Sequence, residues 1–264
     1  MTYTFDTDTV SAVGDGGVTS VDLTDRWNAL GGAPNGGYLA ALSTRALSDE
    51  LAFPDPVVVA TTFVRPARLG PATVTTTELR IGSRFAHGTA TVIQDDVPVV
   101  HTTATFGDLD RLSGKSRVSL TPPDLPAPED CIDITGMLDM PGVSIIDRVE
   151  YRLAALPGWA TGQPSGEPRA EFWMRFSDGR EPDTSSLPFL VDAAAPAVLE
   201  LGVKGSSTIQ LTTHVRAKPT PGWLTCRVAT RCLIDGIHEE DFEVWDWSGQ
   251  LVAQARQLAI IPAG

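Results

Sequence analysis

The sequence lacks a long hydrophobic run, a surplus of positive charge and any closely spaced pair of cysteines. Among its 264 residues, no stretch approaches the roughly 20 consecutive apolar residues that a membrane-spanning helix needs. The first residues show neither the basic segment nor the apolar core of a signal peptide. Three cysteines without CxxC spacing are typical of a reducing compartment. We therefore expect a cytoplasmic protein without a membrane span.

The charge balance argues against a nucleic-acid partner. The formal net charge is −13, whereas nucleic-acid binding needs clustered Lys and Arg side chains that neutralise phosphates. The four histidines are scattered without HxxxH or HxH spacing, so we expect no metal site. Neither GxSxG nor GxGxxG nor a phosphate-binding P-loop occurs, which argues against serine hydrolases of the α/β type and against nucleotide sites.

What the sequence does contain is an internal repeat. Residues 61–65 match residues 212–216 at an offset of 151, with four of the five positions identical. Farther along, residues 99–100 match residues 251–252 at an offset of 152. A nearly constant offset over this distance indicates that a unit of about 130 residues has been duplicated.

Both halves show the same order of predicted elements, namely a leading strand, a helix and four further strands. The first half has a strand near 19–27, a helix over 38–47 and strands near 57–65, 72–81, 85–94 and 98–106. The second half has a strand near 169–176, a helix near 187–202 and strands near 207–217, 223–234, 240–247 and 251–261. One apolar helix against a strongly curved antiparallel sheet buries such a pattern economically, so the fold class is α+β.

The duplication sets the domain boundaries. We expect an N-terminal unit over residues 1–110 and a C-terminal unit over residues 146–264. The segment 111–145 contains the proline-rich stretch 121–128 and has weak periodicity, which predicts a linker between the two units.

Several fragments are informative through their order and spacing, namely Asn35-Gly36-Gly37, residues 79–85 and residues 92–96 in the first half, and residues 149–152, 173–175 and 251–254 in the second. Together they resemble the double-hotdog acyl-CoA thioesterases, of the bacterial acyl-CoA thioesterase II type. The resemblance implies a tandem hotdog fold, in which each repeat has a long central helix wrapped by a curved antiparallel sheet. It also implies hydrolysis of fatty acyl-CoA to free fatty acid and CoA, and hence a role in fatty-acid metabolism. No separate cofactor is expected, because coenzyme A is part of the substrate.

The resemblance also implies which residues carry the chemistry. The family holds the attacking water with an Asp, a Ser or Thr, and a Gln from the second repeat, and these match Asp192, Thr208 and Gln257. Ser207 stands beside Thr208 and is the alternative hydroxyl.

The first repeat offers a substrate-binding element in Asn35, Gly36 and Gly37, which precede the first predicted helix. Free N–H groups and the helix dipole at such a terminus favour an oxyanion, and glycines let a carbonyl approach closely. A helix-entry turn that needs unusual backbone angles explains the same glycines equally well.

The residues themselves support two of the three catalytic assignments. Asp192 is the only charge in the apolar run 187–199, and a buried carboxylate needs partners and often carries function, although exposure or an ion pair with a nearby arginine is the alternative. Gln257 is the lone polar side chain on an alternating apolar face, where a purely structural glutamine is the alternative. Thr208, predicted to share a face with Gln210 and His214, adds little because threonine is common in strands.

The repeat offset predicts a single catalytic site. It places Ala41, Val57 and Thr105 at the positions that correspond to Asp192, Thr208 and Gln257, so the first copy lacks the trio. Two other functions stay open: a non-catalytic acyl-CoA-binding hotdog protein, and an enoyl-CoA hydratase-like enzyme, which would need a histidine beside the aspartate. We also expect self-association into a homo-oligomer, because exposed sheet edges and faces often pair.

Overall fold

A single large antiparallel sheet runs through both halves of the chain in the computed structural model, which describes residues 2–10, 12–13, 17–137 and 140–262. The strand order is β1-β2-β4-β5-β6-β3-β10-β14-β13-β11-β9-β8-β7, and β12 pairs with β13. Within these residues no helix has the length and hydrophobicity to cross a membrane.

The N-terminal half follows the predicted order of elements closely, and its four strands after the helix begin and end within about two residues of prediction. Its elements are α1 (Thr4–Thr9), β1 (Ala12–Val13), β2 (Val18–Leu23), the 3-10 helix η1 (Asp25–Trp27), α2 (Gly36–Ser48), β3 (Asp55–Phe63), β4 (Gly70–Ile81), β5 (Phe85–Gln94) and β6 (Val97–Gly107).

The remainder of the chain contains the second set of strands and several short helical turns. Its elements are the 3-10 helices η2 (Leu109–Arg111), η3 (Pro128–Asp130), η4 (Ile145–Asp147), η5 (Gly158–Thr161) and η6 (Ala197–Leu201), the α-helix α3 (Leu187–Leu190), and the strands β7 (Ile132–Asp133), β8 (Val149–Leu153), β9 (Arg169–Phe176), β10 (Ser207–Val215), β11 (Leu224–Ala229), β12 (Leu233–Ile234), β13 (Ile237–Trp245) and β14 (Leu251–Ile260).

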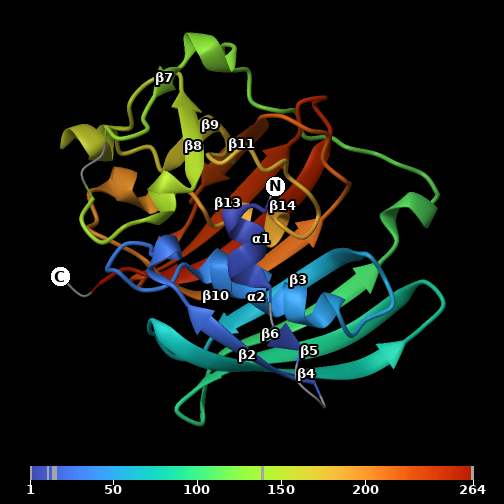
Figure 1. Cartoon of the computed structure of the whole chain (residues 1–264). Coiled ribbons are helices and arrows are strands. Elements are labelled where there is room, and N and C mark those ends of the chain that lie inside the picture. The colour runs from blue at the N-terminus through green and yellow to red at the C-terminus, as the bar shows by residue number, and fades with distance from the viewer. Residues whose placement is uncertain (1, 11, 14–16, 138–139, 263–264) are drawn as a thin grey trace.

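The predicted duplication is visible in the strand order. The first half runs β2-β4-β5-β6-β3 toward the centre of the sheet, and the second half runs toward the same centre in the equivalent order β9-β11-β13-β14-β10, with β8 and β7 lying beyond β9. The two equivalent strands β3 and β10 pair with each other in the middle, with Thr61 opposite Leu211. Figure 1 shows the two halves meeting at this pair.

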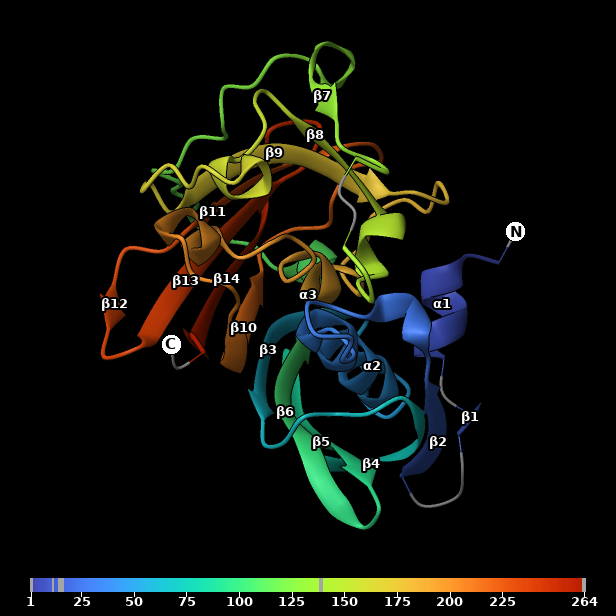
Figure 2. The same cartoon turned by 90° about the vertical axis from the view of Figure 1, so that its left-hand side faces the viewer.

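Helix α2 is the central element of the N-terminal half. The Asn35 side chain caps it by accepting a hydrogen bond from Tyr38 N at 2.9 Å. The helix is rich in Ala and Leu, and nearly every one of its residues is buried. The curved sheet β2–β6 wraps around it (Figures 1 and 2), so the helix presents its N-terminus to the other half of the molecule.

The long helix predicted for residues 187–202 is wrong. The chain forms only the four-residue α3, then a series of turns, and then η6. Pro196 has no N–H to bond the carbonyl of Asp192 and disfavours a helical conformation at the preceding residue. The hydrogen bonds tighten to three-residue spacing before the break, from Asp192 N to the Phe189 carbonyl at 3.0 Å. Asp192 therefore lies in the break of a helix rather than in the middle of one.

Aromatic packing fixes α3 against α2. The Phe189 ring lies edge-on to Trp27 with ring centroids 5.1 Å apart, and Trp27 stacks on Tyr38 of α2 at 5.6 Å. All three side chains are almost fully buried. Aromatic pairs in these geometries add stabilisation beyond the area that they bury. Figure 2 shows α3 lying directly against α2 where the two halves meet.

Candidate active site

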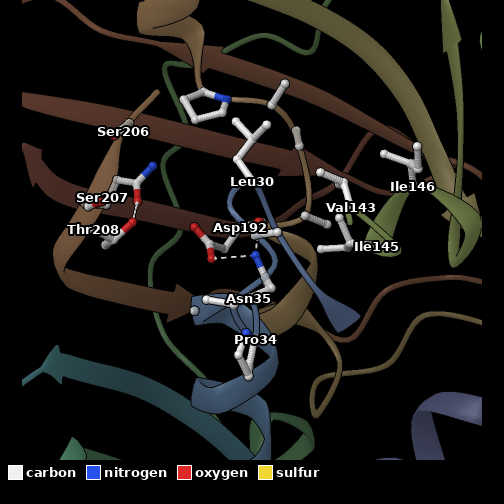
Figure 3. A pocket seen from close by; sticks show the side chains of 18 of the residues that line it. Leu30, Pro34, Asn35, Val143, Ile145, Ile146, Asp192, Ser206, Ser207 and Thr208 are labelled. Carbon is white, nitrogen blue, oxygen red and sulfur yellow. Dashed lines mark hydrogen bonds between the residues drawn. The ribbon is translucent and has the colours of Figure 1, made fainter. Parts of the chain in front are cut away.

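A cavity of about 480 Å³ lies beside this meeting point and is lined by both halves. Its walls are mostly apolar, and its few polar side chains gather on one side, as Figure 3 shows for Asp192 and Thr208. The segment that sequence analysis assigned to a linker contributes a wall as well, through Ile134, Val143 and Ile145. Such a mixture of apolar surface and a few converging polar groups is typical of a small-molecule site.

Asp192 is held at the N-terminus of α2. Its Oδ2 atom accepts hydrogen bonds from Gly37 N at 2.7 Å and from Asn35 Nδ2 at 3.0 Å. Asn35 Nδ2 also donates to the Asp192 main-chain carbonyl at 2.9 Å. Within the described part of the chain, Asp192 takes part in none of the ion pairs, and its Oδ1 atom accepts no hydrogen bond. The carboxylate is therefore held through its Oδ2 atom, and its Oδ1 atom has no hydrogen-bond donor among the described residues.

The environment of Asp192 makes it a suitable base. Burial raises the pKa of its carboxyl group to about 6, because it penalises the charged form, while the hydrogen bonds from Gly37 and Asn35 act in the opposite direction. A carboxyl group with this pKa is ionised at neutral pH but accepts a proton more readily than an ordinary aspartate.

Close approach, rather than unusual backbone angles, explains the two glycines. A Cβ atom on Gly37 would lie 2.7 Å from Asp192 Cβ, and one on Gly36 would lie 2.8 Å from the Phe63 ring. Neither glycine is among the residues with positive φ. The sequence Asn35-Gly36-Gly37 thus lets the end of α3 and the start of α2 come close enough for the carboxylate to receive a main-chain N–H.

A second polar cluster joins Thr208, Gln257 and a residue that the sequence did not single out. The Thr208 hydroxyl donates to Gln257 Oε1 at 2.7 Å, and Gln257 Nε2 donates to Glu240 Oε1 at 2.6 Å. Gln257 lies on the buried face of β14, as its alternation predicted, and only 7% of its surface is exposed. Thr208 and Gln257 line the cavity, whereas Glu240 lies behind Gln257, outside the lining.

The face predicted for Thr208 is wrong, and a β-bulge is the reason. On β14, Thr208 pairs with Ala259 and Gln210 with Leu258, so Ile209 is an extra, unpaired residue. One extra residue shifts the alternation, which places Thr208 on the buried face instead of beside Gln210. The bulge thereby turns Thr208 toward Gln257, while Ser207 is exposed, although it also lines the cavity.

Glu240 is the polar residue that sequence analysis missed. It is 4% exposed, and its Oε2 accepts a hydrogen bond from Ala197 N at 2.6 Å. The pKa of its carboxyl group is raised to about 7, mainly by burial and to a smaller extent by the negative charge of Asp192, while the hydrogen bonds from Ala197 N and Gln257 act in the opposite direction. The available signal was alternation along β13, because Glu240 shares its face with the buried residues Phe242 and Val244.

The predicted site residues therefore fall into two clusters that border one cavity. Asn35 and Gly37 each donate a hydrogen bond to Asp192, and Gly36 lines the cavity beside them. In the described residues, no hydrogen bond links Asp192 directly to the Thr208–Gln257 cluster. That part of the chain also holds no group of three His, Cys, Asp or Glu side chains arranged to bind a metal.

A curved antiparallel sheet around a central helix, with a site at that helix's N-terminus, defines a protein of the hotdog class. A model of the acyl-CoA thioesterase N-terminal domain matches residues 23–107, and a model of the acyl-CoA thioesterase C-terminal domain matches residues 128–261. The chain belongs to the acyl-CoA thioesterase family.

Solved structures share the fold over nearly the whole chain. A candidate thioesterase II of Thermobifida fusca is 28% identical, with a TM-score of 0.88 and 98% of each chain covered. A conserved protein of unknown function with a hotdog fold from Alicyclobacillus acidocaldarius is 24% identical, with a TM-score of 0.88 and full coverage of both chains. Uncharacterised proteins of Mycobacterium bovis and Mycobacterium tuberculosis are 28% identical over 92% of this chain and 90% of theirs.

Proposed function

We propose that this protein is a tandem double-hotdog enzyme that hydrolyses fatty acyl-CoA to fatty acid and CoA, with Asp192 as the general base. The observation that carries the proposal is the placement of the Asp192 carboxylate. Its Oδ2 atom is bound at the N-terminus of α2, and the side chain lines a mostly apolar cavity. Family membership supports the substrate class. The reaction needs no cofactor beyond the CoA that is part of the substrate.

In the proposed reaction, a water molecule lies between Asp192 and Thr208. Asp192 Oδ1 takes one water proton while the water oxygen attacks the thioester carbon, and the carbonyl π electrons move to the oxygen to form the tetrahedral oxyanion. Collapse of this intermediate breaks the C–S bond, and the proton on Asp192 passes to the departing sulfur to give CoA as the free thiol. Fixed positions of water and base supply much of the rate enhancement.

In this proposal, the three residues predicted to bind substrate have two different roles. Asn35 and Gly37 donate to Asp192, so they orient the base. Gly36 occupies the first position of α2, where the helix itself offers its N–H no partner, and it lines the cavity. Its N–H is the donor that we assign to the oxyanion, and the apolar wall around Val143 and Ile145 is assigned to the acyl chain (Figure 3).

The direct test is release of free thiol from a series of acyl-CoA substrates, followed with a thiol-reactive dye. We expect turnover that depends on acyl length. A non-catalytic binding protein would bind acyl-CoA in equilibrium dialysis without releasing thiol, and a hydratase would add water to an enoyl-CoA with its thioester intact. Either result would replace the proposal. Self-association into a homo-oligomer stays a prediction, which light scattering tests.

Activity is expected to fall on the acid side of about pH 6. Only ionised Asp192 accepts a proton, and its pKa is raised to about 6. Below that pH, kcat/KM should therefore fall by roughly tenfold per pH unit, and above it the contribution of Asp192 should level off. Rates measured over pH 4.5–8.5, with folding checked at each pH by circular dichroism, test this. Full activity at pH 4.5 would show that a group with an ordinary aspartate pKa is the base.

The hydroxyl that acts in the site is expected to be Thr208 and not Ser207. Thr208→Ala removes the partner of Gln257 Oε1 and one contact for the water, so kcat should fall roughly tenfold. Ser207→Ala is the matched control, and its kcat should stay close to wild type because the exposed Ser207 lies outside the hydrogen-bonded cluster. The reverse result would assign the role to Ser207.

A further inference from the structure

Glu240 lies behind the proposed site and touches none of the reacting groups. It comes from β13, beside β14, and its two carboxyl oxygens are each committed to a donor. Ala197 N donates to Oε2, and Gln257 Nε2 donates to Oε1, both at 2.6 Å. A neutral acceptor can satisfy a buried amide N–H, so this contact alone does not require a carboxyl group, and burying a carboxyl group costs free energy. The position of Glu240 at the end of the hydrogen-bond chain from Thr208 through Gln257 indicates its role.

The direction of every hydrogen bond in this chain follows from Glu240. A carboxylate only accepts hydrogen bonds, and a main-chain N–H only donates them. Because Ala197 N and the carboxylate are fixed in these roles, the NH2 end of Gln257 must face Glu240 and its carbonyl end must face Thr208. The Thr208 proton is then committed to Gln257, so the lone pairs of Thr208 Oγ1 are left for the cavity.

We propose that Glu240 is a positioning residue that orients Gln257 and Thr208 so that Thr208 accepts a proton from the attacking water instead of donating one to it. This inference rests on the proposed function. A water nucleophile needs an unshared electron pair for the thioester carbon, and both of its protons are then directed at acceptors, Asp192 Oδ1 and Thr208 Oγ1. A Thr208 hydroxyl turned the other way would donate to the water oxygen and occupy the pair that must attack.

The charges around Glu240 make this orientation dependent on pH. Asp192 and Glu239 are the charged groups that act on it, and both raise its pKa. Its hydrogen-bond donors among the described residues are the Ala197 N–H and the Gln257 amide, which do not titrate. His238 precedes it on the same buried face and bonds to Ser206. Protonated Glu240 has an O–H that donates to the Gln257 carbonyl, which reverses the amide and with it the Thr208 hydroxyl.

The first test is Glu240→Gln, which preserves size and removes the charge. The amide oxygen that this substitution introduces accepts from the fixed Ala197 N–H, so the new NH2 group faces Gln257 and reverses its amide. We expect kcat to fall roughly ten- to a hundredfold, with KM within about twofold of wild type because Glu240 does not line the cavity. Glu243→Gln, the same substitution on the opposite face of β13, should change neither constant.

The second test measures the orientation of the Gln257 amide without an activity assay. The side-chain ¹⁵N–¹H signals of Gln257, assigned by their loss in Gln257→Ala, should shift through one titration step near pH 7 in the wild-type protein. They should not do so in Glu240→Gln. Near-UV circular dichroism and thermal unfolding establish that each variant is folded.

The outcomes separate this inference from the proposed function. Wild-type kcat in folded Glu240→Gln, with Asp192→Asn inactive, overturns the inference and leaves the thioesterase proposal standing. A loss of stability at unchanged kcat assigns Glu240 a packing role and also overturns it. If the wild-type protein releases no thiol, the thioesterase proposal fails, and the titration of the Gln257 signals alone decides whether Glu240 sets the orientation.

Discussion

Asp192→Asn is expected to reduce kcat for acyl-CoA hydrolysis by a factor of about 100 or more. The amide oxygen of the substituted side chain can accept the two hydrogen bonds that Gly37 N and Asn35 Nδ2 now give to the carboxylate, so the site keeps its shape. What is lost is the second oxygen as a proton acceptor. Thiol release under single-turnover and steady-state conditions measures the effect, and substrate binding should be largely retained because the amide fills the same space.

The same substitution should stabilise the protein at neutral and alkaline pH. The folded-state pKa of Asp192, about 6, exceeds the ordinary value of 3.8. The stability that this group contributes is therefore fully present below about pH 4 and is lost as the pH rises through about 6. Asparagine does not ionise, so the Tm of the variant should exceed that of the wild type at pH 8 and approach it at pH 4. Unchanged activity in a folded, stabilised variant would rule out Asp192 as the base.

Local sequence patterns predicted the features that depend only on the alternation of side chains along one strand. The strands after α2, the buried face of β14 and the position of Gln257 on it were predicted because side chains alternate along any extended strand. The duplication was predicted because two copies of one fold keep similar residues at equivalent core positions. In the same way, Asp192 was conspicuous because a single charge interrupts an apolar run.

Features that depend on a distant partner could not be predicted. The Ala- and Leu-rich run 187–202 has high helix propensity, yet Pro196 and packing against α2 end the helix after Leu190. The bulge at Ile209 exists only in the pairing between β10 and β14. The face on which Thr208 lies could therefore not be inferred from the sequence of β10 alone. Glu240 is a different case, because alternation along β13 was an available signal for its burial, but it stands in an acidic run, 239–241, which is more typical of a solvated strand.

The break of the second helix determines where Asp192 lies. In the first half a continuous helix places Ala41 inside the core, whereas in the second half the break frees the chain to turn Asp192 toward the start of α2. Tyr151 from β8 secures the turn by donating from its hydroxyl to the Ala193 carbonyl at 2.7 Å. The irregular backbone after α3, which the helix prediction missed, thus brings the Asp192 carboxylate of the second half onto the N-terminus of α2 in the first half.

Gly37→Ala is expected to lower both activity and stability, because this glycine is where α2 and the end of α3 touch. The new Cβ would lie 2.7 Å from Asp192 Cβ and 2.7 Å from the Phe189 carbonyl oxygen, and a main-chain atom cannot move aside as a flexible side chain does. The two segments must separate, which lengthens the hydrogen bond from Gly37 N to Asp192 and displaces the carboxylate that we propose as the base. Overpacking of this kind costs about 1–3 kcal/mol, and the higher helix propensity of alanine offsets at most about 1 kcal/mol. We expect a Tm lower by several degrees and kcat lower by about tenfold or more.

Gly205→Ala is the control, because its Cβ would meet nothing closer than Pro262 Cγ at 3.8 Å, and it should change neither quantity. A Gly37→Ala protein with wild-type kcat and Tm would show that the contact between α2 and Asp192 is looser than described and that the base does not depend on it.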